Sequence, residues 1–231
     1  MILHKMIQIQ GEIVCETGLR IGGSKDTIEI GGLDNPIVRH PIDDLPYIPG
    51  SSFKGKLRSL LESVHGRRRW DRRQRRPIND NGKDPCGCGQ CMVCRIFGSH
   101  NNPGHPLGPT RLLVRDAKLT ESSKEVLEKA QREKGLFFSE VKTENTINRR
   151  TGKAYNPRPY ERVPEGTRFQ LDLLLKIYDT DNEEECIQFV KQGLDLLESD
   201  YLGSSGSRGY GKISFHDLQF IEKEIKKKKE D

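Results

Sequence analysis

The chain has 231 residues, of which 33% are hydrophobic and 32% charged, so it is long enough for one elaborated domain or two small ones. No apolar stretch approaches the roughly 18–20 residues that cross a membrane, and the first residues lack the regions of a signal peptide. The composition argues against a membrane or secreted protein, and we expect a cytoplasmic one.

The formal net charge of +5 is concentrated in one segment. Residues 65–76, HGRRRWDRRQRR, contain seven arginines and one aspartate, so the rest of the chain is close to neutral. Charge of this density suggests a polyanionic partner, although a solvated, disordered loop is the alternative. Residues 222–231 are rich in lysine, and we expect a disordered basic tail there.

The hydrophobic pattern predicts the secondary structure in chain order. Alternating apolar residues indicate strands, and apolar residues three or four apart indicate helices. The elements expected in this way are a strand at 7–15, a helix from Ser51 or Ser52 (either of which could cap it) to about 64, a strand at 112–119, an exposed helix at 122–134, a strand at 168–177, a helix at 182–198 and a strand at 213–221.

Two polar insertions interrupt this order. Residues 65–109 are rich in arginine and cysteine, and residues 140–165 have the pattern of a projecting hairpin. Without them the order is strand–helix–strand, twice over. The sequence therefore predicts one α+β domain over residues 1–231, with a modified ferredoxin-like (RRM-like, βαββαβ) core whose helices cover one face of an antiparallel sheet. Such a fold does not by itself identify a function.

Four of the six cysteines lie within nine residues, in CGCGQCMVC. Four thiolates at this spacing can hold zinc tetrahedrally, so we expect a structural Zn²⁺ site made of Cys86, Cys88, Cys91 and Cys94. Zinc ribbons usually separate their two cysteine pairs widely, so one thiol could be free and a histidine such as His65 could substitute for it. An iron–sulfur cluster is the alternative.

Glycines, small hydroxyl side chains and cations alternate in YLGSSGSRGYGK, residues 201–212. Glycine lets backbone N–H groups approach an anion closely, so contact with phosphate is favoured over a plain turn. The segment follows a predicted helix and opens a strand, which is the reverse of a dinucleotide fingerprint, and it is not a Walker loop.

Among the acidic residues, Asp34 in GGLDNP is the most suggestive for phosphodiester chemistry. From the residues alone, an Asx turn ahead of Pro36 explains it better. Composition and motifs by themselves indicate a basic module that binds RNA or DNA.

Six blocks extend this interpretation: ETGLRIGGS (16–24), GGLDNPIVRHP (31–41), YIPGSSFKGKLRSLLE (47–62), CRIFGS (94–99), FSEVKTENTINRRTGKAYNPRPYERV (138–163) and DYLGSSGSRGYGKI (200–213). Together they resemble the RAMP superfamily, and within it the backbone subunit of type III-A (Csm) CRISPR–Cas effector complexes. The resemblance runs from residue 7 to about 220 and leaves out the arginine-rich insert and the lysine-rich tail.

The resemblance implies an RRM-like palm with a thumb hairpin. Copies of such a subunit stack as a helical filament along the CRISPR RNA, together with other Csm subunits. Complementary target RNA pairs with the guide and is cut at regular intervals with the support of Mg²⁺ or Mn²⁺. Base pairing then reads the sequence while the protein reads backbone and shape. No membrane partner is implied.

The resemblance also implies roles for individual residues. The residue implied to be essential for cleavage is Asp34, which would position a divalent ion or the attacking 2′-hydroxyl. Many relatives have a histidine where this chain has Arg20, which favours phosphate binding here and removes a candidate acid–base residue. The implied RNA contacts are Arg20, Ser51, Ser52, Lys54, Lys56, Arg58, Arg149, Arg150, Arg158, Gly206, Ser207, Arg208 and Gly209.

Two other functions are compatible with the same blocks. One is a filament subunit that binds guide RNA without cutting. The other is an endonuclease that processes precursor CRISPR RNA by acid–base chemistry. The second is disfavoured because His4 and His216 lie in ordinary strand patterns, with no paired histidine and tyrosine.

Overall fold

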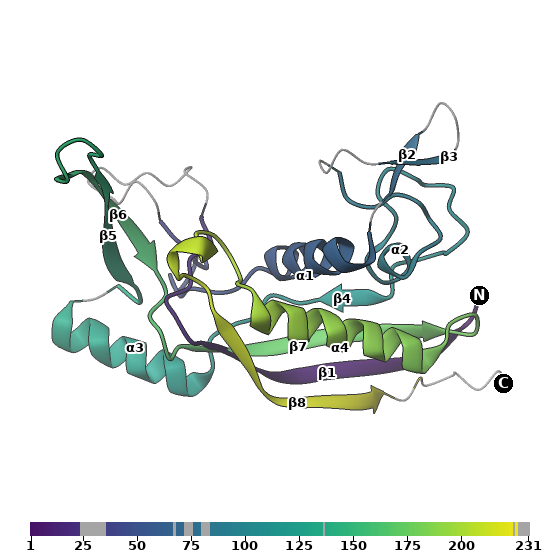
Figure 1. The fold of residues 1–231 in the computed structure, drawn as a ribbon. Coiled ribbons are helices and arrows are strands. Elements are labelled where there is room, and N and C mark those ends of the chain that lie inside the picture. The colour runs from purple at the N-terminus through teal and green to yellow at the C-terminus, as the bar shows by residue number, and fades with distance from the viewer. Residues whose placement is uncertain are drawn as a thin grey trace.

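The computed structural model describes residues 1–23, 36–66, 68–71, 76–79, 84–135, 137–223 and 225. Asp34 lies outside these residues. The elements, labelled in Figure 1, are β1 (Leu3–Cys15), α1 (Gly50–His65), β2 (Arg68–Asp71), β3 (Arg76–Asn79), α2 (Met92–Phe97), β4 (Leu112–Val114), α3 (Glu121–Lys134), β5 (Glu140–Ile147), β6 (Ala154–Arg162), β7 (Arg168–Tyr178), α4 (Glu183–Ser199) and β8 (Ile213–Lys223). Helices and antiparallel sheets are mixed, which confirms the α+β class.

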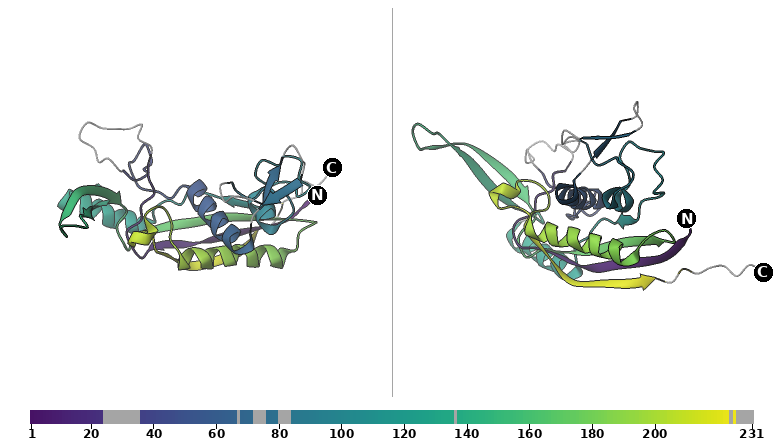
Figure 2. Two further views of the ribbon diagram at one scale, coloured as in Figure 1. Left: turned by 45° about the horizontal axis from the view of Figure 1, so that its top comes forward. Right: turned by 45° about the vertical axis from the view of Figure 1, so that its right-hand side comes forward.

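The central sheet has four antiparallel strands in the order β4-β7-β1-β8. Helices α1 and α4 lie side by side on one of its faces (Figures 1 and 2). The alternation predicted for β7 is present, because Phe169, Leu171, Leu173, Leu175 and Ile177 are all at most 4% exposed. Burial of one sheet face thus fixes the register of the long strands.

The two helices pack closely because a glycine lies between them. A Cβ at Gly193 of α4 would lie 2.9 Å from Leu61 Cδ1 and 3.1 Å from Leu57 Cδ1, both in α1. A larger side chain at this position would push the helices apart. No helix in the described ranges is both long and apolar enough to cross a bilayer.

The start of α1 differs from the prediction. Pro49 occupies the N-cap position, and no side chain in the cap makes a hydrogen bond, so capping by Ser51 or Ser52 was wrong. Instead, Gly50 N donates to Asp116 Oδ1 at 2.7 Å. Regular pairing of β4 ends at Val114, so β4 is shorter than the strand expected at 112–119. Beyond it, Ala117 bridges Ile48 and Leu119 bridges Phe169 of β7.

The two insertions form separate two-stranded ribbons. The β5–β6 hairpin projects from the body, while β2–β3, inside the arginine-rich segment, lies near the other end of α1 (Figures 1 and 2). The second half of the 65–109 insertion joins the main core, since Val93 and Ile96 of α2 are fully buried. At the C-terminus, Lys223 of the expected tail pairs with Met6 in the sheet.

Candidate functional site

Three segments that are distant in sequence meet at the N-terminal end of α1. They are the residues after β1, the first turns of α1 and the glycine-rich segment after α4. Between them lies an open pocket of about 320 Å³. Its lining residues are Arg20, Ile21, Gly22, Ser52, Lys56, Gly203 and Ser204. Arg20, Ser52 and Lys56, which the resemblance selected separately, are thus brought together.

Arg20 is held in place by the glycine-rich segment and by the hairpin. Its Nη1 donates to Ser204 Oγ at 2.9 Å, and its guanidinium lies over the Tyr160 ring, 5.2 Å from the centroid. The backbones run close together, because Ser204 N donates to Arg20 O at 2.9 Å. A Cβ at Gly203 would lie 2.3 Å from that same oxygen, so this approach requires glycine.

Lys56 is fixed by two neighbours from the end of α4. Its Nζ lies 2.7 Å from Asp200 Oδ2 and 3.6 Å from the centroid of the Tyr201 ring. A Cβ at Gly206 would lie 2.0 Å from Tyr201 Cγ, so the turn at Gly206–Arg208 rests directly on this ring. The glycine-rich segment therefore supports a cation of the pocket through an aromatic side chain.

The first turn of α1 adds partial positive charge to the pocket. N–H groups in the first turn have no acceptor within the helix, and the helix dipole is positive at this end. Asp116 takes the N–H of Gly50, whereas Ser52 lines the pocket and Ser51 is exposed. Two fixed cations beside a helix N-terminus and a glycine backbone have the chemistry of a phosphate site.

The structure does not bring Lys54 and Arg58 to this pocket. Lys54 Nζ donates to Leu112 O at 3.0 Å, and burial lowers the pKa of this lysine. Arg58 Nε lies 2.7 Å from Glu62 Oε1, and its Nη2 donates to Cys86 O at 2.7 Å. Lys54 thus contacts the backbone of β4, and Arg58 contacts the backbone of the cysteine-rich loop.

The glycine-rich turn also contacts the β5–β6 hairpin. Arg208 Nη1 lies 2.7 Å from Glu144 Oε2 in β5. Ser207 and Gly209 beside it are exposed. The predicted hairpin arginines are also exposed, with two near the tip and the third in β6: Arg149, Arg150 and Arg158. These side chains are open to a ligand along the outside of the hairpin.

Both ends of the segment that carries Asp34 are anchored next to the pocket. Gly22 forms an antiparallel bridge with Ile37, and Gly23 N donates to Pro36 O at 3.1 Å. Gly22 itself lines the pocket. The residues on either side of 24–35 therefore pair with each other at the pocket's edge.

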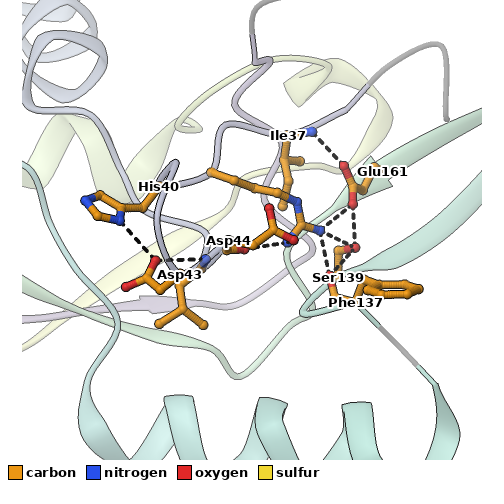
Figure 3. Close-up of polar contacts among 9 residues, drawn as sticks. Ile37, His40, Asp43, Asp44, Phe137, Ser139 and Glu161 are labelled. Carbon is orange, nitrogen blue, oxygen red and sulfur yellow. Dashed lines mark hydrogen bonds and ion pairs between the residues drawn. The ribbon is translucent and has the colours of Figure 1, made fainter. Parts of the chain in front are cut away.

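A buried polar cluster that the sequence did not reveal secures the second of these ends (Figure 3). Glu161 of β6 accepts hydrogen bonds from Ile37 N (2.8 Å) and from Arg39 Nη2 (2.6 Å). Ser139 Oγ donates to the same carboxylate at 2.6 Å. Burial favours the neutral acid, but the three donors and the charge of Arg39 outweigh it and lower the pKa of Glu161.

A second candidate site is made of Cys86, Cys88, Cys91 and Cys94. Their sulfur atoms all lie within 4.8 Å of one another. Cys86 and Cys91 Sγ are 3.7 Å apart, and Cys88 and Cys94 Sγ are 3.8 Å apart. Zn–S bonds of about 2.3 Å in a tetrahedron place sulfurs about 3.8 Å apart, so this donor set fits a single metal ion such as zinc.

Local structure preorganises the four thiols. Cys91 is the N-cap of α2, and its Sγ accepts from Cys94 N at 3.5 Å. Glu62 of α1 accepts from Cys86 N at 2.8 Å, which ties the loop to the helix. His65, the predicted substitute, is not in the group, since its Nε2 lies 2.7 Å from Gln192 Oε1.

Comparisons with known proteins identify the family. The sequence model of the RAMP superfamily matches residues 12–214. The chain is 45% identical over 228 residues to the CRISPR system endoribonuclease Csm3 of Methanothermobacter thermautotrophicus, covering 94% of this chain and 86% of that protein. It is 40% identical over 221 residues to Csm3 of Methanocaldococcus jannaschii, covering 95% and 82%. Among solved structures, it is similar to a Csm3–Csm4 subcomplex of the type III-A CRISPR–Cas interference complex, with a TM-score of 0.60 and 30% identity over 96% of this chain and 82% of that one.

Proposed function

The chain belongs to the RAMP superfamily and, within it, to the Csm3 family, and from this we propose that it is a backbone subunit of a type III-A CRISPR effector complex that cuts target RNA. The observation that carries the proposal is the pocket at the start of α1. It gathers Arg20, Lys56 and the α1 N-terminus, and the segment with Asp34 begins and ends beside it.

In this proposal the pocket holds the phosphate backbone of the guide RNA. Arg20 and Lys56 supply positive charge from fixed positions, and Ser51, Ser52 and the glycine-rich segment 206–209 supply hydrogen-bond donors. Arg149, Arg150 and Arg158 contact the guide–target duplex from the hairpin. Lys54 and Arg58 act indirectly, by holding α1 against Leu112 and Cys86.

Asp34 is the proposed catalytic residue. Its carboxylate would hold Mg²⁺ or Mn²⁺ or orient the attacking 2′-hydroxyl, and the metal would offset the charge that develops on the phosphate. The supporting observation is that residues 24–35 are anchored at both ends beside the pocket.

We also propose that the core is a single ferredoxin-like, RRM-like domain and that the β5–β6 hairpin is its thumb. The strand order β4-β7-β1-β8 supports this, since sheets of this fold place the first and third core strands at the centre. Assembly with other copies of the chain and with other Csm subunits is proposed from the likeness to the Csm3–Csm4 subcomplex.

For the four cysteines we propose a structural zinc ion. All four thiols are engaged in one compact group, which leaves no open position for catalysis. Bound zinc would tie residues 86–94 to α1 through the contacts of Glu62 and Arg58 with Cys86.

Purification of the assembled complex tests the proposed function. We expect guide RNA to copurify and complementary RNA to be cut at a regular spacing in the presence of Mg²⁺. Assemblies without ribonucleotide would contradict the proposal. Guide RNA with no cutting would indicate a purely structural filament subunit, and metal-independent cutting of precursor hairpins would indicate a processing enzyme.

The arginine-rich ribbon β2–β3 is not part of the six blocks that carry the RAMP resemblance, and we predict that it adds salt-sensitive RNA binding. If about four of its arginines neutralise phosphates, log K should fall against log salt with a slope of roughly −3 for single-stranded RNA. Deletion of residues 67–76 should remove that part of the slope. A slope that stays the same after the deletion would show that the ribbon does not contact RNA.

A further inference from the structure

One face of the β5–β6 hairpin is continuous with the pocket. In an antiparallel pair, residues directly opposite each other point to the same face. Glu144 of β5 pairs with Arg158 of β6, and Tyr160 lies two residues farther along β6. On this face Glu144 Oε2 lies 2.7 Å from Arg208 Nη1 in the glycine-rich turn, and the Tyr160 ring lies against Arg20, which lines the pocket. This is the inner face of the hairpin.

A β-bulge extends the inner face from Arg158 to Tyr155. These two residues are three apart, so in a regular strand they would point to opposite faces. The register shifts between them, because Glu144 pairs with Arg158 while Thr146 pairs with Tyr155. Two residues of β6 therefore oppose one residue of β5, and Tyr155 returns to the face of Arg158.

The backbone of this bulge is unusual. Asn156 has a φ of 54°, in the left-handed region that residues other than glycine seldom adopt. Bulges and backbone of this kind are found preferentially beside functional sites, where they re-aim a side chain. The residue re-aimed here, Tyr155, is 52% exposed, so much of its surface is available to a ligand.

We infer that Tyr155 stacks on an unpaired nucleobase of single-stranded RNA. An aromatic ring with an arginine beside it suits a base and its phosphate, because every base has a π-face and the arginine supplies the charge. A strand rises about 3.3 Å per residue, so Tyr155 lies roughly 15 Å beyond Tyr160 along the inner face. One RNA strand held in the pocket could therefore reach it. The inference rests on the function proposed above, since it needs RNA in the pocket.

The substitution Tyr155→Ala in the full chain tests this with a fluorescein-labelled oligouridine. We expect the affinity to fall about 5- to 150-fold, the effect typical of losing one stacked base. No charge is lost, so the slope of log K against log salt should stay that of the wild type. Arg158→Ala should instead make this slope shallower by about 0.7. Both residues are exposed, so the thermal unfolding midpoint should change little in either variant.

Three further measurements sharpen the test. Tyr155→Phe keeps the ring and should bind like the wild type, whereas Tyr155→Leu keeps apolar bulk without a π-face and should bind nearly as weakly as Tyr155→Ala. Ile147→Ala is the matched control, because Ile147 is 48% exposed and pairs with Ala154 on the opposite face of the hairpin. Its affinity should be unchanged. Ultraviolet irradiation of the wild-type chain with oligouridine should give a crosslink that mass spectrometry maps to Tyr155.

The outcomes separate this inference from the proposed function. Equal affinities of the wild type and Tyr155→Ala, with weaker binding by Lys56→Ala, would overturn the stacking role alone. So would a loss that Tyr155→Phe shares in full, or one that is matched by a fall in the thermal midpoint. A wild-type chain that binds no RNA, by itself or in the assembled complex, would overturn the proposed function and this inference with it.

Discussion

Replacing Asp34 by alanine should abolish target RNA cutting and leave assembly intact. The carboxylate is proposed to hold the metal ion that offsets charge in the transition state or to orient the attacking 2′-hydroxyl, and loss of one such transition-state interaction typically costs about 10²–10³ in rate. Binding of the target should persist, because base pairing with the guide supplies most of its recognition. Cleavage of labelled target RNA by the assembled complex and a parallel binding assay measure the two effects.

Asp195→Ala is a suitable control for this experiment. Asp195 is exposed on α4. Its replacement by alanine removes the same charge outside the pocket, so cutting should continue at the wild-type rate. Asp34→Asn, which keeps the side-chain shape, should be as inactive as Asp34→Ala. Undiminished cutting by either Asp34 variant would refute the catalytic assignment, and loss of target binding would point to a role in RNA affinity.

The second large effect is expected from Cys88→Ser. Loss of one of four thiolates should release the metal, and we expect zinc to fall from about one ion per chain to near zero. Loss of a structural metal is among the few changes that destabilise a protein strongly. A loss of about 3 kcal/mol would lower the melting temperature of a chain of this size by roughly 6–12 °C. Elemental analysis and thermal unfolding measure both quantities.

Cys186→Ser provides the comparison. Cys186 is buried in α4 outside the four-cysteine group, and burial raises its pKa to about 11, so it behaves as an ordinary core thiol. This variant should keep its zinc even if it loses some stability. Full zinc retention by Cys88→Ser would contradict the proposed site, and stoichiometric iron with visible absorbance would indicate an iron–sulfur cluster instead.

The long elements of the core could be predicted from sequence because burial leaves a periodic trace. The alternation in β7 and the apolar stripe of α1 both correspond to side chains that face the same core. The helix cap was mispredicted because its partner, Asp116, is 66 residues away from Gly50. A local pattern records which face is buried, but it does not record which distant side chain completes a cap.

The candidate site shows the same limit. Arg58, which the resemblance selects as an RNA contact, pairs with Glu62 four residues later, and that spacing is a readable sign of an ion pair within the helix. The Glu161–Arg39 pair has no such sign, since its members are 122 residues apart. Similarly, the Tyr201 ring supports Lys56 in the pocket, and although Tyr201 opens the glycine-rich segment, nothing in that motif indicates this role.

The contact between Gly206 and the Tyr201 ring has a consequence for surveys of amino-acid tolerance. A methyl group at position 206 would displace the ring, and with it the surface on which the Lys56 ammonium rests. Saturation mutagenesis should then find Gly206 as intolerant as a residue that contacts RNA, although it has no side chain to offer. Intolerance at this position would therefore report on the shape beneath a cation as well as on any contact of its backbone with RNA.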